Sequence, residues 1–272
     1  MLKYPHLFSP IKVGNVVFRN RIFASPTGWT DIRNDHTLDD RATLYYGRKA
    51  EGGAAAVCVG ECQVDPQRSS RGGNCIDLSN PRTLKFMFRI ADNITRHGAV
   101  ASAELAHCGR YGAYGFAPSA GDADGKACVE MTEEEILDTI KAYGTAAFNA
   151  KMNGYQMVTV HGGHGWLPEQ FFSRTTNQRT DRWGGSLENR SRFAVAVCDE
   201  IHKRCGKNYP IEFRISAVET EFGYDLDEGI EYAKALDGHA DIIHVSAGVH
   251  GTLMHDNWEV CAPGMFSDEG NL

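Results

Sequence analysis

Two histidines three residues apart, His161 and His164, are the residues whose type and spacing most clearly suggest chemistry in this sequence. They follow a short apolar run, residues 157–160, so they stand where a buried strand is expected to end. Imidazole N–H groups on such a strand-to-loop turn can converge on one oxygen atom and stabilise negative charge that develops there. The carboxyl end of a strand is the active face of an α/β barrel. We therefore expect both histidines at a catalytic site.

A charged residue also stands within a second apolar run. Arg214 lies in the middle of residues 211–216, and a charge in a buried strand is uncommon without a purpose. It could be a structural ion-pair partner, or it could hold negative charge on a bound molecule. No lysine stands at a recognisable strand end, which disfavours an aldolase or lyase barrel that works through a Schiff base.

The elements that must position these residues alternate along the chain. Thr132 and Glu135 form a capping box that opens a helix ending near Gly154, and two more helices are expected at residues 188–204 and 227–236. Between the helical stretches, six runs read as strands buried on both faces: 21–25, 54–60, 99–105, 157–161, 211–216 and 242–246. Alternation of this kind predicts an α/β fold, a TIM (β/α)8-type barrel with about six of its eight units in this chain.

Composition narrows the function classes. The chain has 272 residues and a formal net charge of −7, and no basic run favours nucleic acid or a membrane surface. The first residues lack the apolar core of a signal peptide, so we expect a cytoplasmic protein. Eight cysteines are scattered without a close C-x-x-C pair, so we expect no metal site. A homo-oligomer is compatible with the composition.

Several motifs, in this order and spacing, resemble the old yellow enzyme family of FMN-dependent ene-reductases. They are the segments 7–11 and 20–21, Gly60 and Glu61 at the close of the second strand, residues 104–110, the histidine pair, residues 180–190 and the strand around Arg214. The resemblance covers nearly the whole chain and implies FMN, with NADH or NADPH as the reductant. It implies that His161 and His164 bind the carbonyl oxygen of the substrate. It also implies that the flavin is bound by Ser25, Pro26, Thr27, Gly60, Glu104 and Arg214.

Two residues depart from the family's pattern. Glu104 stands where the family usually has glutamine, and an ionised glutamate can only accept hydrogen bonds. Its charge would also oppose negative charge on the reduced flavin. Trp166 stands where the family commonly has the tyrosine that protonates the substrate, and an indole is no practical acid. We expect Trp166 and Tyr111 to line the substrate pocket, with the proton supplied by Tyr111, Tyr114, Cys108 or water.

The resemblance implies hydride transfer from NAD(P)H, through flavin, to a small enone- or enoate-type alkene. A flavin-dependent dehydrogenase of the same fold is the alternative enzyme. We expect one flavin-binding domain over residues 1–272, incomplete at its carboxyl end because two strand–helix units are missing from the pattern. The loops of those units commonly bind phosphate, so a non-catalytic barrel fragment is the alternative outside the enzymes.

Overall fold

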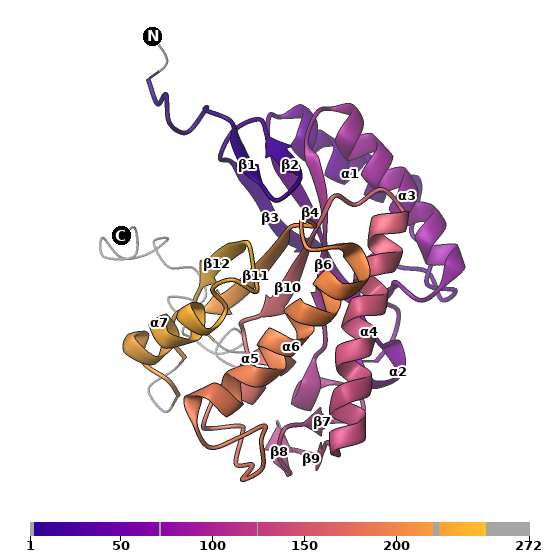
Figure 1. The fold of residues 1–272 in the computed structure, drawn as a ribbon. Helices are drawn as coiled ribbons and strands as arrows, with labels where there is room; N and C mark the ends of the chain where they lie inside the picture. Colours follow the sequence, from indigo (N-terminus) through magenta and orange to yellow (C-terminus); the bar gives the residue numbers. More distant parts are fainter. Residues whose placement is uncertain (1–2, 71, 124, 220–222, 249–272) are drawn as a thin grey trace.

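The computed structural model describes residues 3–70, 72–123, 125–219 and 223–248, which form a curled parallel sheet with helices packed along its outer side (Figure 1). Six of the seven described strands of this sheet stand in space in their order along the chain, and each pair of neighbours among them is parallel. They are β3 (Phe23–Gly28), β4 (Ala56–Gln63), β6 (Val100–Ala106), β10 (Met157–Gly162), β11 (Ile211–Ser216) and β12 (Ile242–Ser246).

All six predicted strands are present, and together they form part of an α/β barrel, as the sequence predicts. The bounds of β11 and β12 are those predicted. The expectation that Gly60 and Glu61 close the second strand is wrong, because β4 continues to Gln63. Past Gly60 this strand pairs with β6 again, at Cys62 and Leu105, and also with the short β5 (Ile76–Asp77). Gly60 therefore lies within the sheet.

Helices follow the strands and cover the outer face of the sheet (Figure 1). The capping box that opens α4 is confirmed, because the Thr132 hydroxyl accepts from the backbone of Glu135 and the Glu135 side chain accepts from the backbone of Thr132. In the layer, α1 packs against α3, α4 against α6, and α6 against α7. The long helices are α1 (Asp40–Glu51), α3 (Pro81–Arg96), α4 (Glu133–Met152), α6 (Leu187–Cys205) and α7 (Leu226–Ala235). The short ones are α2 (Pro66–Ser69), α5 (Leu167–Phe172) and the 3-10 turn η1 (Gly109–Tyr111).

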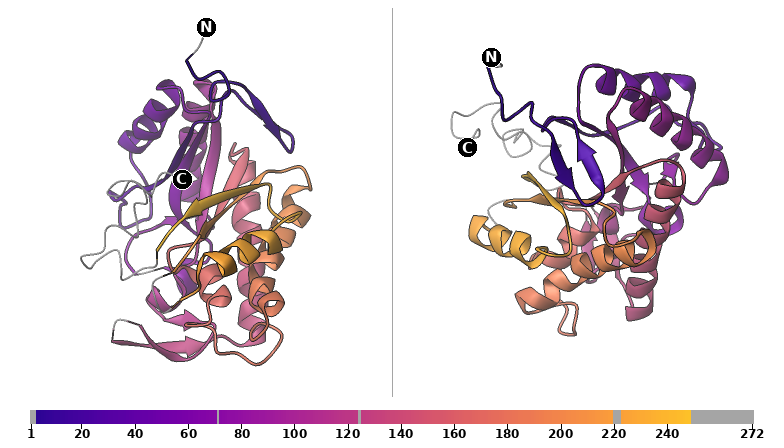
Figure 2. Two further views of the ribbon diagram at one scale, coloured as in Figure 1. Left: turned by 90° about the vertical axis from the view of Figure 1, so that its left-hand side faces the viewer. Right: turned by 45° about the horizontal axis from the view of Figure 1, so that its top comes forward.

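Two small sheets, which the sequence analysis does not predict, lie at opposite ends of the main sheet (Figures 1 and 2). An antiparallel hairpin, β1 (Ile11–Val13) with β2 (Val16–Phe18), packs its apolar side chains against Met157 and Val100 at the amino end of the strands. At the carboxyl end the chain inserts β7, β8 and β9 between β6 and α4. These strands span Phe116–Ala117, Gly121–Ala123 and Lys126–Glu130.

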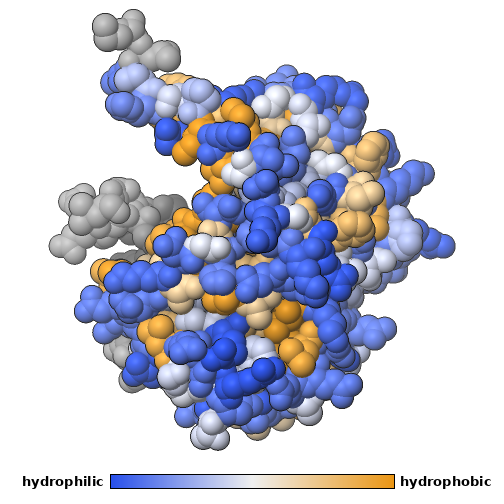
Figure 3. Space-filling model, viewed as in Figure 1, coloured by the Kyte–Doolittle hydropathy of each residue, from blue (hydrophilic) through white to orange (hydrophobic). Residues whose placement is uncertain are grey.

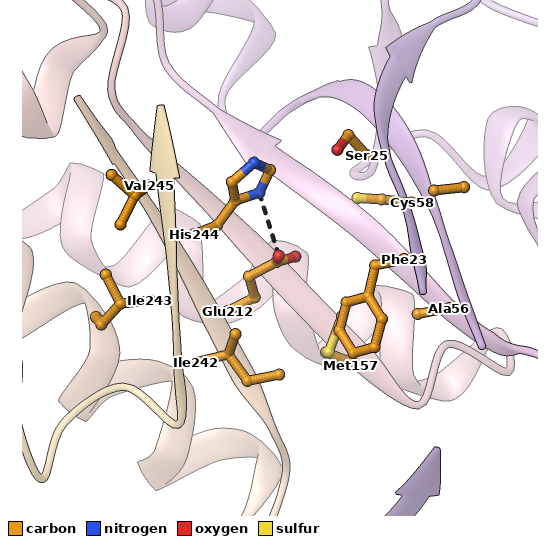
Figure 4. Close-up of a pocket in the computed structure, with 11 residues that line it drawn as sticks. Phe23, Ser25, Ala56, Cys58, Met157, Glu212, Ile242, Ile243, His244 and Val245 are labelled. Atoms are coloured by element: carbon orange, nitrogen blue, oxygen red, sulfur yellow. Dashed lines mark ion pairs between the residues drawn. The ribbon is translucent and has the colours of Figure 1, made fainter. Parts of the chain in front are cut away.

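The outermost strands of the described sheet, β3 and β12, flank a cavity of about 270 Å³ (Figure 4). Phe23 and Ser25 approach it from β3, and Glu212 and His244 from β11 and β12. His244 Nδ1 and Glu212 Oε1 are 3.2 Å apart. The cavity lies inside the curled sheet, and Ser25, one of the residues that the sequence assigns to a site, is among the residues that line it.

The outer surface carries no large continuous apolar area on the face that Figure 3 shows; apolar residues there form separate groups among hydrophilic ones. Within the ranges described above, no helix is long and apolar enough to cross a membrane.

Candidate active site

Side chains from three adjacent strands meet inside the curled sheet near the carboxyl ends of the strands. His161 of β10 stands beside Arg214 of β11 in the register, and β6 on the other side contributes Glu104. The Glu104 Oε1 atom lies 3.4 Å from Arg214 Nη1 and 3.5 Å from His161 Nδ1. All three positions alternate inward along their strands, which is why residues far apart in the sequence form one cluster. The structure thus brings together three of the predicted site residues.

The two histidines contact one another. His161 Nε2 lies 3.1 Å from His164 Nδ1, and the rings are perpendicular with centroids 5.2 Å apart. His164 Nε2 continues the contact to Ser246 Oγ on β12, at 2.7 Å. Glu104, His161, His164 and Ser246 therefore form a continuous polar chain from β6 to β12. Its direction of donation depends on the tautomers of the rings.

Burial determines the protonation states of His164 and Glu104 in this polar chain. Desolvation lowers the pKa of His164 to about 3, and the nearby charge of Arg214 acts in the same direction. The ring is therefore neutral at neutral pH, and it can donate from one nitrogen while it accepts at the other. Desolvation raises the pKa of Glu104 to about 8, although Arg214 opposes this shift. At neutral pH the carboxyl is mostly protonated, so it can donate a hydrogen bond as well as accept one.

Gly60 brings the second strand close to Glu104. A Cβ atom at Gly60 would lie 2.4 Å from Glu104 Oε2 and 3.1 Å from Pro26 Cβ, so a side chain at this position would have to displace the Glu104 carboxyl group. The β3–β4 register shifts between Ala24 and Thr27, which forms a bulge at the predicted cofactor segment. Pro26 and Glu104, which like Gly60 are predicted cofactor residues, thus both pack closely around Gly60.

Thr27 has its polar atoms engaged in holding this segment. Its carbonyl accepts from Tyr46 Oη at 2.7 Å, and its hydroxyl accepts from Lys49 Nζ at 2.8 Å. Ser25 accepts at its carbonyl from the Thr27 hydroxyl at 3.3 Å and lines the cavity in Figure 4. The bulge is therefore anchored to α1, which holds its backbone in place.

A flavin fits this donor set. The buried Arg214 Nε atom has no hydrogen-bond partner among the described residues, so one donor of the guanidinium is available to a ligand. A neutral Glu104 offers one donor and one acceptor, the combination that the amide of glutamine supplies. Gly60 and the Pro26 bulge let backbone approach closely. In the described ranges no group of three or more His, Cys, Asp and Glu residues is arranged to hold a metal ion.

Trp166 and Tyr111 lie beside the histidine pair. Trp166 is buried, with its ring edge-on to His161 at 5.6 Å between centroids and edge-on to Tyr111 at 6.2 Å. Tyr111 comes from η1 after β6. Of the other candidate proton donors, Tyr114 is 59% exposed, whereas the buried Cys108 places its thiol 3.4 Å from Glu61 Oε1. The predicted pocket residues are therefore adjacent to the predicted catalytic ones.

The sequence analysis misses three of the described residues that contact the histidine loop, Ser216, Ser246 and Glu169. Ser246 follows the same alternation along β12 as Arg214 and Ser216 do along β11, so strand periodicity could have placed it at the site. Glu169 is fully buried on α5, and nothing in the sequence distinguishes it from a solvated helix glutamate.

Gly162 offers a test of how tightly this site is packed. A Cβ atom there would lie 2.1 Å from Cε1 of the fully buried Phe213. We expect Gly162→Ala to lower the free energy of unfolding by about 2 kcal/mol through overpacking. Gly121→Ala is the matched control, because nothing lies within 4 Å of its Cβ position and its change should be small. Chemical denaturation would measure both; equal stabilities for the two variants would contradict the packing.

The chain matches the family described as NADH:flavin oxidoreductase / NADH oxidase over residues 6–259. It is 33% identical over 264 residues to the NADH oxidase of Thermoanaerobacter brockii, covering 93% of this chain and 41% of that protein. It is 32% identical over 302 residues to the cinnamate reductase of Clostridium sporogenes, covering 98% of this chain and 44% of that protein. The chain thus spans about two fifths of the length of these curated relatives.

Among solved structures, the complex of 2-naphthoyl-CoA reductase with 2-naphthoyl-CoA is similar, with a TM-score of 0.80 and 30% identity. The alignment covers 91% of this chain and 41% of that one.

Proposed function

Because the chain belongs to the NADH:flavin oxidoreductase / NADH oxidase family, we propose that it works with FMN to pass hydride from NADH or NADPH to an alkene conjugated to a carbonyl group. The observation that carries the proposal is the His161–His164 pair, which lies in contact with Glu104, beside Arg214. The names of two relatives, cinnamate reductase and 2-naphthoyl-CoA reductase, support a reductase that acts on C=C bonds.

FMN, when bound, supplies the hydride chemistry, and the protein holds and polarises the reactants. We assign the cofactor to Ser25, Pro26, Thr27, Gly60, Glu104 and Arg214. The guanidinium of Arg214 would stabilise negative charge on the reduced ring, since this side chain is largely buried and keeps an unpartnered Nε.

The histidines would polarise the substrate. Hydride delivery to a conjugated alkene places negative charge on the carbonyl oxygen, and imidazole N–H groups aimed at that oxygen stabilise it. In this structure the ring nitrogens of His161 and His164 face each other, Glu104 and Ser246. A substrate oxygen would therefore replace one of these contacts. The His164 ring, which is neutral, could donate one N–H group to that oxygen.

Protonation of the substrate carbon completes the reduction. Trp166 fills the wall of the pocket next to His161 but supplies no proton. The Tyr111 ring packs edge-on against Trp166. We therefore place Tyr111 first among the proton donors, ahead of Cys108 and water.

The proposal is tested first at the level of the cofactor. Titration of the purified chain with FMN, followed by flavin fluorescence, should show saturable binding. Anaerobic addition of NADH or NADPH should then bleach the flavin absorbance, and the faster reductant identifies the preferred nicotinamide. A chain that binds FMN saturably but whose flavin neither nucleotide reduces would contradict the proposed source of hydride.

Glu104 gives a pH-dependent prediction. With its pKa raised to about 8, the carboxyl is neutral below that pH and ionised above it. An ionised carboxylate beside the cofactor should lower the flavin's reduction potential, because it repels the negative charge of the reduced ring. We therefore expect Glu104→Gln to match the parent chain at pH 6.5 and to have the higher potential at pH 9.

Potentiometric titration of both FMN-loaded proteins at the two pH values measures this difference. A constant difference at both values, or a lower potential in the Gln variant at pH 9, would contradict a titrating Glu104.

A further inference from the structure

The backbone of the histidine loop is held in an unusual conformation. His164 has φ = 57° and Gly165 has φ = 79°, so two successive residues are left-handed. Glycine adopts this region freely, but a histidine does so rarely and at a cost in energy. The conformation turns the His164 ring toward His161 and Ser246. Neighbouring groups must therefore hold the loop for this geometry to persist.

Two backbone N–H groups of the loop reach one buried acid and the hydroxyl beside it. The Gly165 amide donates to Glu169 Oε2, and the His164 amide donates to Ser216 Oγ at 2.9 Å. Ser216 Oγ in turn lies 3.4 Å from Glu169 Oε2. Glu169 is fully buried on α5, the short helix that directly follows the loop. One side chain thus contacts both the loop and the end of β11.

The second oxygen of Glu169 shows which protonation state fits. Tyr224 Oη lies 2.8 Å from Glu169 Oε1 and also 2.8 Å from the Ser216 carbonyl. The tyrosine has a single hydroxyl proton, and a carbonyl can only accept. If Tyr224 donates its proton to the Ser216 carbonyl, it cannot also donate to Glu169. The contact between Glu169 Oε1 and Tyr224 Oη is then a hydrogen bond only when the carboxyl is protonated and donates to the phenol oxygen. The neutral carboxylic acid therefore satisfies both short contacts.

The surroundings favour the same state. Desolvation, reinforced by the nearby Glu219, raises the pKa of Glu169 to about 8. The titratable groups that act on or respond to Glu169 in the described part of the chain are Glu219, Tyr224 and Tyr232. None of these is a cation that would stabilise an ionised Glu169.

We propose that Glu169, as a neutral acid, is a positioning residue that holds the left-handed His164–Gly165 turn and so presents the His164 ring for substrate binding. The role of the ring in binding substrate rests on the proposed function, but the hold on the turn does not. Substitution with glutamine should preserve the arrangement, since an amide keeps a donor nitrogen and an acceptor oxygen at nearly the same positions.

Amide hydrogen exchange of the full chain, measured by NMR for His164 and Gly165, tests the hold without any cofactor. We expect Glu169→Ala to speed exchange at both amides by about tenfold or more, as the loss of one buried hydrogen bond would. Glu169→Gln should stay within about threefold of the parent chain. The amide of Val158 in β10 reports global unfolding, and rates are compared relative to it.

Two further variants keep the test decisive if the alanine variant does not fold. Glu169→Asp retains a buried acid but withdraws it by one methylene, so it should also speed exchange at Gly165. Ser216→Ala should speed exchange at His164 and leave Gly165 near the parent rate, since only the first amide donates to that hydroxyl. Unchanged exchange in Glu169→Ala or Glu169→Asp, or a glutamine variant as fast as these two, would overturn the proposal.

The FMN-loaded variants then connect the hold to substrate. We expect Glu169→Ala to raise KM for the alkene and Glu169→Gln to restore it. If no alkene is reduced by the parent chain, the proposed function fails while the exchange result still decides the role of Glu169. Accelerated exchange with an unchanged KM would overturn the link between the turn and substrate binding.

Discussion

Replacement of either His161 or His164 by alanine is expected to slow alkene reduction by about a hundredfold or more, the usual effect of removing one donor to a developing oxyanion. Reduction of the flavin by NADH or NADPH should change much less, because no carbonyl oxygen is polarised in that step. Rapid-mixing absorbance measurements separate the two half-reactions in FMN-loaded protein.

The contact between the rings adds a second expectation. His161 Nε2 and His164 Nδ1 are 3.1 Å apart, so each single replacement also removes a partner of the remaining ring. The effects should therefore not add, and the double variant should be little slower than the slower single variant. His239→Ala on the surface is the control, since this ring pairs only with the exposed Asp199 in the described structure. A double variant that reduces alkene at the parent rate would remove the pair from the mechanism.

The second large effect concerns Arg214 and the cofactor. Arg214→Met keeps the length of the side chain but removes its charge and its unpartnered donor. Hydrogen bonds to charged groups contribute about 1.5–3 kcal/mol, so FMN should bind roughly tenfold to a hundredfold more weakly. Fluorescence titration with FMN measures the dissociation constant directly.

The neighbouring Glu104 determines whether the Arg214→Met variant should still fold. Arg214 lies 3.4 Å from Glu104, so its removal leaves a buried carboxyl without its cation. Because Glu104 is mostly neutral at pH 7, the folded protein should tolerate the change. Arg192→Met, on an exposed face of α6, controls for the loss of one positive charge. Unchanged FMN affinity in Arg214→Met, or an equal loss of affinity in Arg192→Met, would contradict the assignment.

The main sheet is predictable from the sequence because each buried strand is a continuous apolar run, which is a local feature. Apolar runs that are buried on both faces identify the six longer parallel strands, and the family resemblance assigns His161, Glu104 and Arg214 to one site. Inward alternation along β6, β10 and β11 explains why the three side chains meet. The capping box at Thr132 predicts the start of α4 in the same way.

The elements that the sequence does not reveal depend on partners far along the chain. The hairpin β1–β2 has strands of three residues each, too short for a period, and it is stabilised by packing on Val100 and Met157. The strands β7, β8 and β9 are also too short to be recognised from a period in the sequence. The charge state of Glu104 is also a tertiary property, because the burial that raises its pKa exists only after the strands have paired. Glu169 is missed for the same reason.

The oxidative half-reaction tests the central claim most directly. The chain is loaded with FMN, reduced anaerobically with one equivalent of NADH or NADPH, and mixed with 2-cyclohexenone or with the saturated ketone cyclohexanone. Our account predicts that the flavin absorbance returns with the enone in a concentration-dependent manner, that it does not return with the ketone, and that cyclohexanone is the product of the enone reaction. A flavin that both nucleotides reduce but that conjugated alkenes of this class, cinnamate included, leave reduced would contradict alkene reduction. Reduction of the oxidised flavin by a saturated compound under the same conditions would instead assign the site to a dehydrogenase.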